Sequence, residues 1–339
     1  MTRNVAVLGA TGLVGRTLCG LLESRDFPLR DLRLLASERA AGRSLRFRGR
    51  DVPIEPVGPD AFQGVDLALF CVENPLAERW APVAVAAGTR VIDHSSAFRY
   101  HDDVPLVVPE VNAATLDARP RLIANPNCST IGLVVALAPL LALGRFERLV
   151  VSTYQSVSGG GQDALDELER GIRSGLEGDA PPPRAGGLPP FAFNVVPHID
   201  RFEDNGYTRE EMKIVWETRK ILGLPALPVT ATAVRVPVRV GHAAAVNLEF
   251  DRTVDRDAVR AAWAGAPGLR VVDDPTAARY PTPLESAGRD DVLVGRLRRD
   301  VSRGTALEFF IASDNLRKGA ALNAVQIAEA LDRVEAATR

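Results

Sequence analysis

Short apolar runs alternate with helical patterns over the first part of the chain. Residues 4–8 form an apolar run, a glycine-rich stretch follows at 9–15, and leucines at helical spacing occupy 16–24. Further strand-like runs lie at 32–36, 66–72, 90–93 and 106–108, and a helical or loop pattern covers 76–87. This alternation predicts an α/β fold with a doubly wound parallel sheet of the Rossmann type.

The pattern changes after the apolar run at 131–144. That run contains Pro139 and is shorter than a membrane span, so it predicts a buried helix. Long runs rich in β-branched residues follow at 148–154, 229–240 and 244–250, and they predict a second, α+β domain with a more antiparallel sheet. Prolines and glycines at 179–190 predict a surface loop inside this domain.

The last segment predicts a long terminal helix, because its apolar residues recur at helical spacing over 314–333. We expect this helix to return to the first domain. The predicted boundaries are therefore 1–127 with the C-terminal helix segment 314–339 for one domain, and 128–313 for the other.

Charge, cysteine content and the positions of the histidines indicate which partners and sites are not expected. The 339 residues carry 41 Lys and Arg against 43 Asp and Glu, and this net charge of −2 favours neither nucleic acid nor an anionic membrane as partner. Three cysteines are too few for a disulfide framework and fit a reducing compartment, so without a signal peptide we expect a cytoplasmic protein. The four histidines are far apart in sequence, and no metal site is expected.

Gly9, Gly12 and Gly15 stand between the first predicted strand and the first predicted helix. Glycines in this context let the backbone approach a pyrophosphate, and the helix N-terminus behind them supplies N–H donors. The spacing is a variant of the common dinucleotide-binding pattern, and it predicts a nucleotide site.

The end of the second strand bears on the choice of nicotinamide cofactor. Ser37 and Arg39 could hold a 2′-phosphate, which favours NADP. Glu38 could instead hold a ribose 2′-hydroxyl, which favours NAD. We expect NADP and keep NAD as the alternative.

Cys128 is the candidate nucleophile. It lies among polar residues at 125–130, directly before the apolar helix, and the positive end of a helix dipole favours the thiolate form. Cys19 and Cys71 lie within apolar patterns, where simple burial explains them. A thiolate beside a nicotinamide cofactor suggests a thioester that gives or takes a hydride.

Such chemistry also needs a group that exchanges protons. His242 closes a β-rich run near Arg235 and Arg239, which suits an acid/base group next to an anion site. On the residues alone, His198 remains the alternative.

Seven motifs then occur in the order found in one known family. They are GATGLVG at 9–15, SSAFR at 95–99, NPNCST at 125–130, YQSVSGGG at 154–161, EEMKIVWETRKI at 210–221, RVPVRVGH at 235–242 and DNLRKGAALNAVQIAE at 314–329. Over essentially its full length, the sequence resembles the bacterial aspartate-semialdehyde dehydrogenase family.

The resemblance implies the reductive dephosphorylation of L-4-aspartyl phosphate by NADPH to aspartate semialdehyde and phosphate, on the route to lysine, diaminopimelate, threonine, methionine and isoleucine. Cys128 would attack the acyl phosphate, Gln155 would orient the thioester, and His242 would be the acid/base partner. The resemblance also implies a homodimer or homotetramer, an NADP-binding domain at 1–127 with 314–339, and a catalytic and dimerisation domain at 128–313.

The same resemblance implies the binding residues. The phosphate would meet Arg99, Asn127 and Lys213, while Arg235 would hold the α-carboxylate and Glu210 the ammonium of the substrate, with Gln155 beside them. The cofactor contacts implied are Gly9, Thr11, Gly12, Leu13, Val14, Gly15, Ser37, Arg39, Ala40, Ser158, Gly159 and Asn315.

Several positions depart from the family pattern. Cys71-Val72-Glu73-Asn74 replaces small residues and glycines, His94 stands where Asn is usual, and Ala243-Ala244 replaces Ser-Glu. The first two changes bear on cofactor affinity, and the third on support of His242.

Two other functions are compatible with parts of the pattern. N-acetyl-γ-glutamyl-phosphate reductase shares the fold and the cysteine, but its cysteine follows a His-Pro-Gly run that is missing here. A catalytically silent paralogue that acts as a binding protein would be expected to lose Cys128 or Gln155, and both are present.

Overall fold

The computed structural model describes residues 2–40 and 42–336. Residues 1, 41 and 337–339, which include the end of the predicted segment 314–339, lie outside the described residues. The chain divides into two compact units. Unit 1 comprises residues 1–127 with 320–339, and unit 2 comprises residues 128–319.

Unit 1 contains a sheet that, within the described residues, has seven strands in the order β3-β4-β2-β1-β5-β6-β7. The strands are β1 (Arg3–Leu8), β2 (Leu29–Ala36), β3 (Ser44–Phe47), β4 (Arg50–Pro56), β5 (Leu67–Phe70), β6 (Arg90–Asp93) and β7 (Leu122–Ala124). Neighbours from β4 across to β7 are parallel, whereas the edge pair β3–β4 is antiparallel. The predicted Rossmann-type class is confirmed.

The predicted strand at 106–108 is wrong. Leu106 forms a single bridge to Ala124, and β7 takes the edge position of the sheet. Pro105 and Pro109 flank the run and cannot donate to a strand ladder, so no strand continues there. The apolar pattern also gives no indication of β3 and β4, because β3 is only four residues long and prolines interrupt β4.

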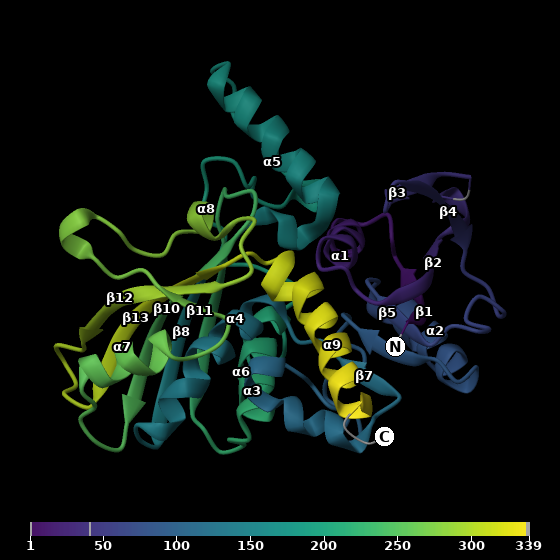
Figure 1. The fold of residues 1–339 in the computed structure, drawn as a ribbon. Coiled ribbons are helices and arrows are strands. Elements are labelled where there is room, and N and C mark those ends of the chain that lie inside the picture. The colour runs from purple at the N-terminus through teal and green to yellow at the C-terminus, as the bar shows by residue number, and fades with distance from the viewer. Residues whose placement is uncertain (1, 41, 337–339) are drawn as a thin grey trace. The chain divides into compact units, whose positions relative to one another are not determined.

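The helices of unit 1 are α1 (Leu13–Ser24), α2 (Asn74–Ala86), α3 (Pro109–Asn112) and α9 (Leu322–Ala336). Figure 1 shows α9, in yellow, among the elements of unit 1, and its apolar residues share one core with those of α1. The Arg3 guanidinium in β1 donates to Glu335 of α9 at 2.7 Å, which ties the last helix to the first strand.

The terminal helix begins at Leu322 and not at residue 314. The Asp314 carboxylate accepts from the backbone N–H groups of Leu316 and Arg317, at 2.8 and 2.9 Å, and this local turn competes with helix formation. A π-helical segment, Arg317–Ala321, then leads into α9. Residues 314–319 therefore belong to unit 2.

Unit 2 contains a mixed sheet whose described part has six strands in the order β11-β12-β13-β10-β8-β9. Its strands are β8 (Phe146–Gln155), β9 (Val229–Arg235), β10 (His242–Phe250), β11 (Leu269–Val271), β12 (Val292–Arg299) and β13 (Ala306–Ser313). Its helices are α4 (Cys128–Leu137), α5 (Gly161–Leu176), α6 (Arg209–Leu222), α7 (Arg256–Ala264) and α8 (Pro283–Ser286). The central pairs β10–β8 and β10–β13 are antiparallel, as expected for the α+β domain.

Two predicted elements of unit 2 are shorter than expected, and proline explains both. The buried helix starts at Cys128 and ends at Leu137, after which Ala138–Ala142 continues as 3₁₀ helix because Pro139 cannot donate within an α-helix. The run at 229–240 is a strand only to Arg235, since Pro237 follows two residues later.

The sheet of unit 2 is covered by helices on one face. α4, α6 and α7 pack there, and the Trp263 indole N–H of α7 donates to the Ala136 carbonyl of α4 at 2.9 Å. On the other face Tyr154 of β8 and Phe310 of β13 pack together with ring centroids 5.9 Å apart, and Tyr154 is exposed.

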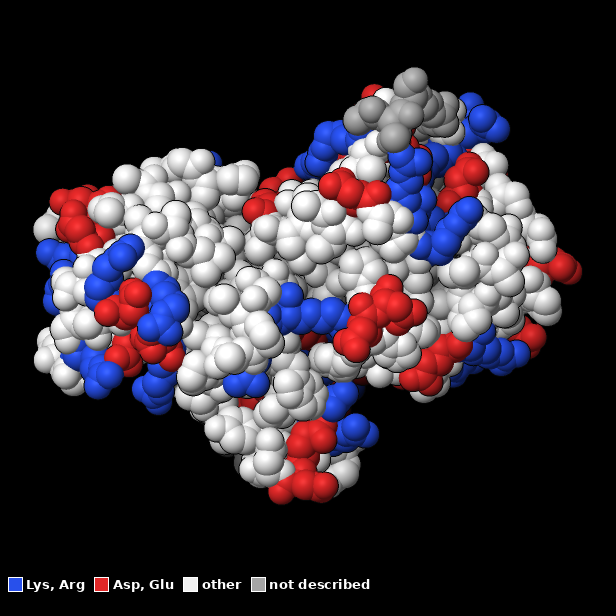
Figure 2. All heavy atoms as spheres, turned by 90° about the horizontal axis from the view of Figure 1, so that it is seen from below, with Lys and Arg blue, Asp and Glu red and all other residues white. Residues whose placement is uncertain are grey.

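One face of the protein carries charges of both signs. Figure 2 shows Lys and Arg interspersed with Asp and Glu on the visible face, in agreement with the net charge of −2. Among the described residues, none of the helices has the length and apolar character required to cross a membrane.

Candidate functional site

The glycine loop of unit 1 joins β1 to α1 and allows no side chain at two of its positions. Gly9 has φ +87°, and a Cβ there would collide with the Cys71 carbonyl oxygen. A Cβ at Gly15 would collide with the Gly9 carbonyl oxygen. Gly12 forms the N-cap of α1 without a side-chain cap, so the first turn of the helix, which includes Leu13 and Val14, can direct its N–H groups toward an anion.

The turn after β2 carries the residues expected to distinguish NADP from NAD. Glu38–Ala40 forms a 3₁₀ turn in which Ala40 is buried, while Ser37, Glu38 and Arg39 are exposed. Because β1 and β2 are parallel neighbours, this turn and the glycine loop lie at the same edge of the sheet. The turn thus exposes a hydroxyl and a guanidinium, with one carboxylate beside them.

Arg99 is buried at the carboxyl edge of the same sheet. Its Nε donates to the Asn125 carbonyl at 3.0 Å, and its Nη2 donates to the His94 carbonyl at 2.6 Å. Both acceptors are neutral carbonyl oxygens, and the charge of Arg99 also acts on the buried Asp93 carboxyl group. Asn125 is held by Asn323 of α9 at 2.8 Å, and Asn127, also buried, ends the strand–loop segment that begins with β7.

The departures of unit 1 from the family pattern have structural roles. The His94 Nδ1–H donates to the Phe70 carbonyl at 2.9 Å, and the Cys71 Sγ lies 3.8 Å from the same nitrogen. Burial raises the pKa of Cys71 well above its usual range and lowers the pKa of His94 to about 4, so both groups are neutral. The Asn74 amide donates to the Ser96 hydroxyl at 3.0 Å and so anchors the start of α2.

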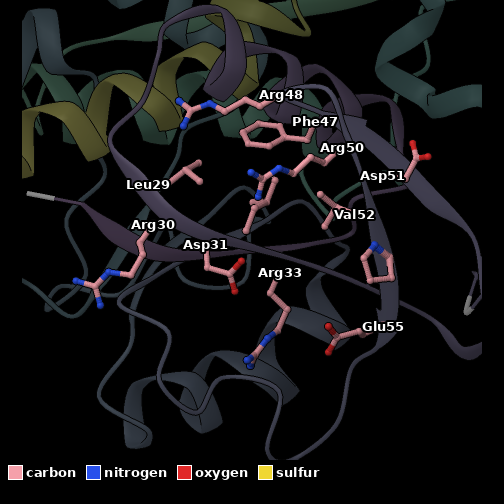
Figure 3. Close-up of a pocket in the computed structure, with 12 residues that line it drawn as sticks. Leu29, Arg30, Asp31, Arg33, Phe47, Arg48, Arg50, Asp51, Val52 and Glu55 are labelled. Carbon is pink, nitrogen blue, oxygen red and sulfur yellow. The ribbon is translucent and has the colours of Figure 1, made fainter.

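One hollow in unit 1 lies away from all predicted site residues. It has a volume of about 540 Å³ and lies beside the amino half of β2 and the β3–β4 hairpin. Figure 3 shows Arg30, Arg33 and Arg50 around it together with Asp31 and Glu55. The glycine loop follows the carboxyl end of β1, so this hollow is not part of the candidate site.

In unit 2, Cys128 is the first residue of α4 and is half-buried. The backbone at Gly319 passes so close that a Cβ there would lie 3.2 Å from the Cys128 Cβ. Two positive influences act on the thiol: the N-terminal end of α4, and the charge of Arg235, which interacts electrostatically with Cys128. Both favour the nucleophilic thiolate.

A polar network connects the end of β8 with the start of α6. The Gln155 amide at the end of β8 donates to Glu210 Oε1 at 3.2 Å, and the Lys213 ammonium donates to Glu210 Oε2 at 3.1 Å. Glu210 is buried. Glu210 and Lys213 both lie in the first turns of α6, where a Thr208–Glu211 capping box starts the helix. The predicted residues Gln155, Glu210 and Lys213 are thus brought together.

Asp200 extends this network and is not indicated by the sequence pattern. Its Oδ2 accepts from the Lys213 ammonium at 2.7 Å. Partial burial opposes ionisation of Asp200, but the hydrogen bond and charge of Lys213 outweigh it and lower the pKa. Asp200 lies in a loop with φ +70°, and no periodic signal marks such a residue.

Arg235 is buried at the end of β9 and donates from Nη1 to the Ser156 carbonyl at 2.7 Å. The predicted loop at 179–190 brings a second guanidinium near it, because the charge of Arg184 acts on Arg235. Arg184 itself stacks over the Phe191 ring at 4.0 Å. This loop residue, like Asp200, has no recognisable sequence signal.

His242 begins β10 and is buried in the same cluster. The backbone N–H of Ser156 donates to its Nδ1 at 3.0 Å. Burial, followed by the charge of Arg235, lowers its pKa to about 3, so the imidazole is neutral. The alternative, His198, instead stacks on Phe202 with centroids 4.6 Å apart.

The three remaining predicted residues of unit 2 surround His242. Asn315 donates to the Ser158 hydroxyl at 2.9 Å. Gly159 lies directly against Arg235 and His242, because a Cβ there would lie 2.9 Å from Arg235 Nη1 and 3.4 Å from His242 Nε2. The Ala243-Ala244 departure lies buried in the sheet, and Ser156 provides the support of the imidazole instead.

Two family models match the chain, one in each unit. The family model of the semialdehyde dehydrogenase NAD binding domain matches residues 4–119, and that of the semialdehyde dehydrogenase dimerisation domain matches residues 137–318. The chain is 50% identical to an aspartate-semialdehyde dehydrogenase of Legionella pneumophila over 97% of this chain and 96% of the relative. It is 43% identical to that of Bacillus subtilis, with 98% of each chain covered.

Solved structures show the same likeness. The crystal structure of aspartate semialdehyde dehydrogenase II from Vibrio cholerae, complexed with ASA, has a TM-score of 0.94 and 45% identity, and covers 98% of this chain and 99% of that one. The enzyme of Candida albicans, solved with NADP, has a TM-score of 0.78 and 26% identity, with 99% of each chain covered.

Proposed function

The chain belongs to the aspartate-semialdehyde dehydrogenase family, and we propose that it converts L-4-aspartyl phosphate to L-aspartate 4-semialdehyde and phosphate with NADPH. This reaction serves amino-acid biosynthesis at the branch toward lysine and diaminopimelate, threonine, methionine and isoleucine. The observation that carries the proposal is Cys128 at the N-terminus of α4, facing the charge of Arg235 in a cluster of buried polar groups.

The Cys128 thiolate attacks the acyl carbon of the substrate. A C–S bond forms, the C–O bond to phosphate breaks, and phosphate leaves with the electron pair. NADPH supplies the hydride that reduces the resulting thioester. The tetrahedral adduct on Cys128 then expels the thiolate, which takes back the C–S electron pair and releases the aldehyde.

Recognition of the substrate follows from the charges of the cluster. Arg235 offers a planar fork to the α-carboxylate, Glu210 accepts the ammonium, and Gln155, bonded to Glu210, orients the carbonyl. The family resemblance assigns binding of the phosphate to Lys213, Arg99 and Asn127. His242, whose imidazole is neutral, is the proposed acid/base partner.

For the cofactor, the proposal is NADP. The steric exclusion of side chains at Gly9 and Gly15 supports a pyrophosphate against the glycine loop, with Thr11 to Val14 around it. Ser37, Arg39 and Ala40 would hold the adenosine end. Ser158, Gly159 and Asn315 would contact the nicotinamide end, and the close approach of Gly159 to His242 supports this placement.

We assign the domains accordingly. Residues 1–127 with the C-terminal helix bind NADP, and residues 128–313 provide catalysis and dimerisation. The sheet face of unit 2 that exposes Tyr154 supports assembly into a homodimer or homotetramer. The proposed location is the cytoplasm.

The reverse reaction tests the proposal directly. Purified protein is given L-aspartate semialdehyde, phosphate and NADP, and NADPH absorbance is followed, with NAD and N-acetylglutamate semialdehyde in parallel. We expect phosphate-dependent NADPH formation with aspartate semialdehyde alone. A signal only with the acetylated substrate would establish the rival reductase, and no signal from a folded, NADP-binding protein would establish a silent paralogue.

A further inference from the structure

Glu210 and Lys213 carry opposite charges and contact each other at the start of α6. The Lys213 ammonium donates to Glu210 Oε2 at 3.1 Å. The two side chains are only 14% and 7% exposed, so solvent screens their attraction weakly. Under the proposed function, Glu210 takes the substrate ammonium and Lys213 takes the phosphate. A closed ion pair between them would weaken both contacts, because each charge would already be neutralised.

Asp200 gives the same ammonium a second acceptor. Its Oδ2 accepts from Lys213 Nζ at 2.7 Å, which is shorter than the bond to Glu210. The Asp200 Oδ1 accepts the backbone N–H of Arg201 at 2.8 Å, so the two oxygens have separate partners. Two carboxylates therefore share one ammonium, and when all three groups are ionised they keep a net negative charge.

The loop that carries Asp200 is tied to the start of α6. The backbone N–H of Arg209, the first residue of the helix, donates to the Arg201 carbonyl at 2.7 Å. Phe202 and Thr208 form a β-bridge across the loop. Asp200 has φ +70°, in the left-handed region, which Asp and Asn tolerate better than longer side chains. The fold therefore fixes a short carboxylate beside the first turns of α6.

We propose that Asp200 is a positioning residue that holds the Lys213 ammonium away from full pairing with Glu210, so that the two groups bind opposite charges of the substrate. This inference rests on the proposed function and deepens it. Asp200 leaves Glu210 with negative charge for the substrate ammonium. Because a lysine side chain loses much rotamer freedom on binding, an ammonium that is already held in place binds phosphate more tightly.

Asp200→Asn tests the proposal in the reverse reaction. The amide has nearly the same shape, tolerates the positive φ and can still accept from Arg201, but its NH₂ group cannot accept from an ammonium. We expect the KM values for phosphate and for aspartate semialdehyde to rise about three- to tenfold, with kcat and the KM for NADP little changed. Unchanged KM values would overturn the proposal. A lower phosphate KM would also overturn it, since Asp200 would then only repel the anion.

Glu203→Gln is the matched control. Glu203 lies in the same loop and pairs with Arg201 and Arg209, at 3.8 and 3.2 Å, so the variant removes an equal charge from the loop. Both KM values should stay within about twofold of the wild type. Rises equal to those in Asp200→Asn would assign the effect to the charge of the loop and overturn the proposal.

A double-mutant cycle shows whether Asp200 acts through Lys213. Lys213→Ala should raise the phosphate KM by itself. Adding Asp200→Asn to this variant should change the phosphate KM by less than about twofold, because the ammonium that Asp200 holds is already gone. A full further loss would show that Asp200 acts through another group and would contradict the proposal.

The Lys213 side chain can also be observed without turnover. The chain contains three lysines, Lys213, Lys220 and Lys318, so labelling with ¹³C at lysine Cε gives few signals, and Lys213→Ala identifies the signal of Lys213. We expect ¹³C relaxation to show more motion on the ps–ns timescale in Asp200→Asn than in the wild type or Glu203→Gln. Equal mobility in all three would refute the positioning role. If the wild type does not turn over aspartate semialdehyde, the proposed function fails, while this measurement still decides whether Asp200 holds Lys213.

Discussion

The glycine loop of unit 1 and the buried cluster of unit 2 differ in the groups that they present to a ligand. The loop excludes side chains: Cβ atoms at Gly9 and Gly15 would collide with backbone carbonyl oxygens, so the backbone itself is the binding surface. The cluster is made of side chains, with Gln155, Glu210 and Arg235 buried and joined to their surroundings by hydrogen bonds.

This difference assigns nucleotide binding to the loop and the covalent step to the cluster. A backbone surface at a helix N-terminus binds phosphate groups and cannot exchange protons or form covalent bonds. A cluster of desolvated ionisable groups can stabilise a thiolate and a developing oxyanion. Changes to the loop should therefore alter nucleotide binding, whereas changes to the cluster should alter the covalent step.

The largest effect is expected for Cys128→Ala. Loss of the nucleophile should lower kcat by roughly 10⁴-fold or more, while the dissociation constant of NADPH changes little. Steady-state rates and a fluorescence titration with NADPH measure the two quantities. Cys71→Ala is the matched control, since that buried thiol is neutral and structural, and it should keep most of the activity. Substantial turnover in Cys128→Ala would refute the thioester mechanism.

Gly15→Ala should damage the loop and leave the cluster intact. Because the new Cβ collides with the Gly9 carbonyl, we expect a loss of about 1–3 kcal/mol in the free energy of unfolding and at least tenfold weaker NADP binding. Gly20→Ala in the same helix is the control, since nothing lies within 4 Å of its Cβ position. Cys128 should still react with a thiol reagent in the Gly15→Ala variant. Equal stability and equal NADP affinity in the two variants would contradict the steric argument.

Acid should destabilise the protein through its buried imidazoles. His94 has its pKa lowered from 6.5 to about 4 by burial, so below pH 6.5 the unfolded chain takes up a proton that the folded protein does not. The free energy of unfolding should therefore fall as the pH decreases from 6.5 toward 4, by at most about 1.4 kcal/mol per pH unit for each such group. Urea unfolding of His94→Asn should show a smaller slope, and an identical slope would count against this assignment.

Arg235→Lys should act on substrate binding. Replacing the planar fork by a single ammonium should raise the KM for aspartate semialdehyde about tenfold, with the cofactor KM little affected. Initial rates at varied semialdehyde and fixed NADP provide the measurement. An unchanged semialdehyde KM would remove Arg235 from the carboxylate site.

The smallest effect is expected at Arg39, which is exposed. Arg39→Ala should weaken NADP binding by about three- to tenfold and leave NAD binding nearly unchanged, because only NADP carries the 2′-phosphate. Glu38→Gln is the complementary variant and should weaken NAD binding preferentially. Equal losses for both cofactors in Arg39→Ala would show that the guanidinium does not read the 2′-phosphate.

The sequence indicates the loop more completely than the cluster. Gly9, Gly12 and Gly15 are close together between a strand and a helix, so their spacing alone predicts their structure. Cys128 is also indicated locally, by polar neighbours before an apolar helix. The roles of Gln155 and Arg235 followed only from the family resemblance.

The rest of the cluster depends on contacts between residues distant in sequence. Asp200 and Arg184 lie in loops and reach Lys213 and Arg235 only in the folded chain. Ser156 contributes through its backbone N–H, which no residue type encodes. The prolines around 106–108 likewise show that an apolar run is not sufficient for a strand when the backbone cannot donate.

The proposed reaction depends on covalent chemistry at Cys128, separate from nucleotide recognition, and a single-turnover measurement detects the covalent step. Enzyme is mixed with NADP and L-aspartate semialdehyde without phosphate, and NADPH absorbance is followed while the intact protein mass is recorded. We expect a burst of about one NADPH per active site and an acyl adduct on Cys128, followed by steady turnover once phosphate is added. Steady turnover without phosphate, or a burst that leaves Cys128 unmodified, would contradict it.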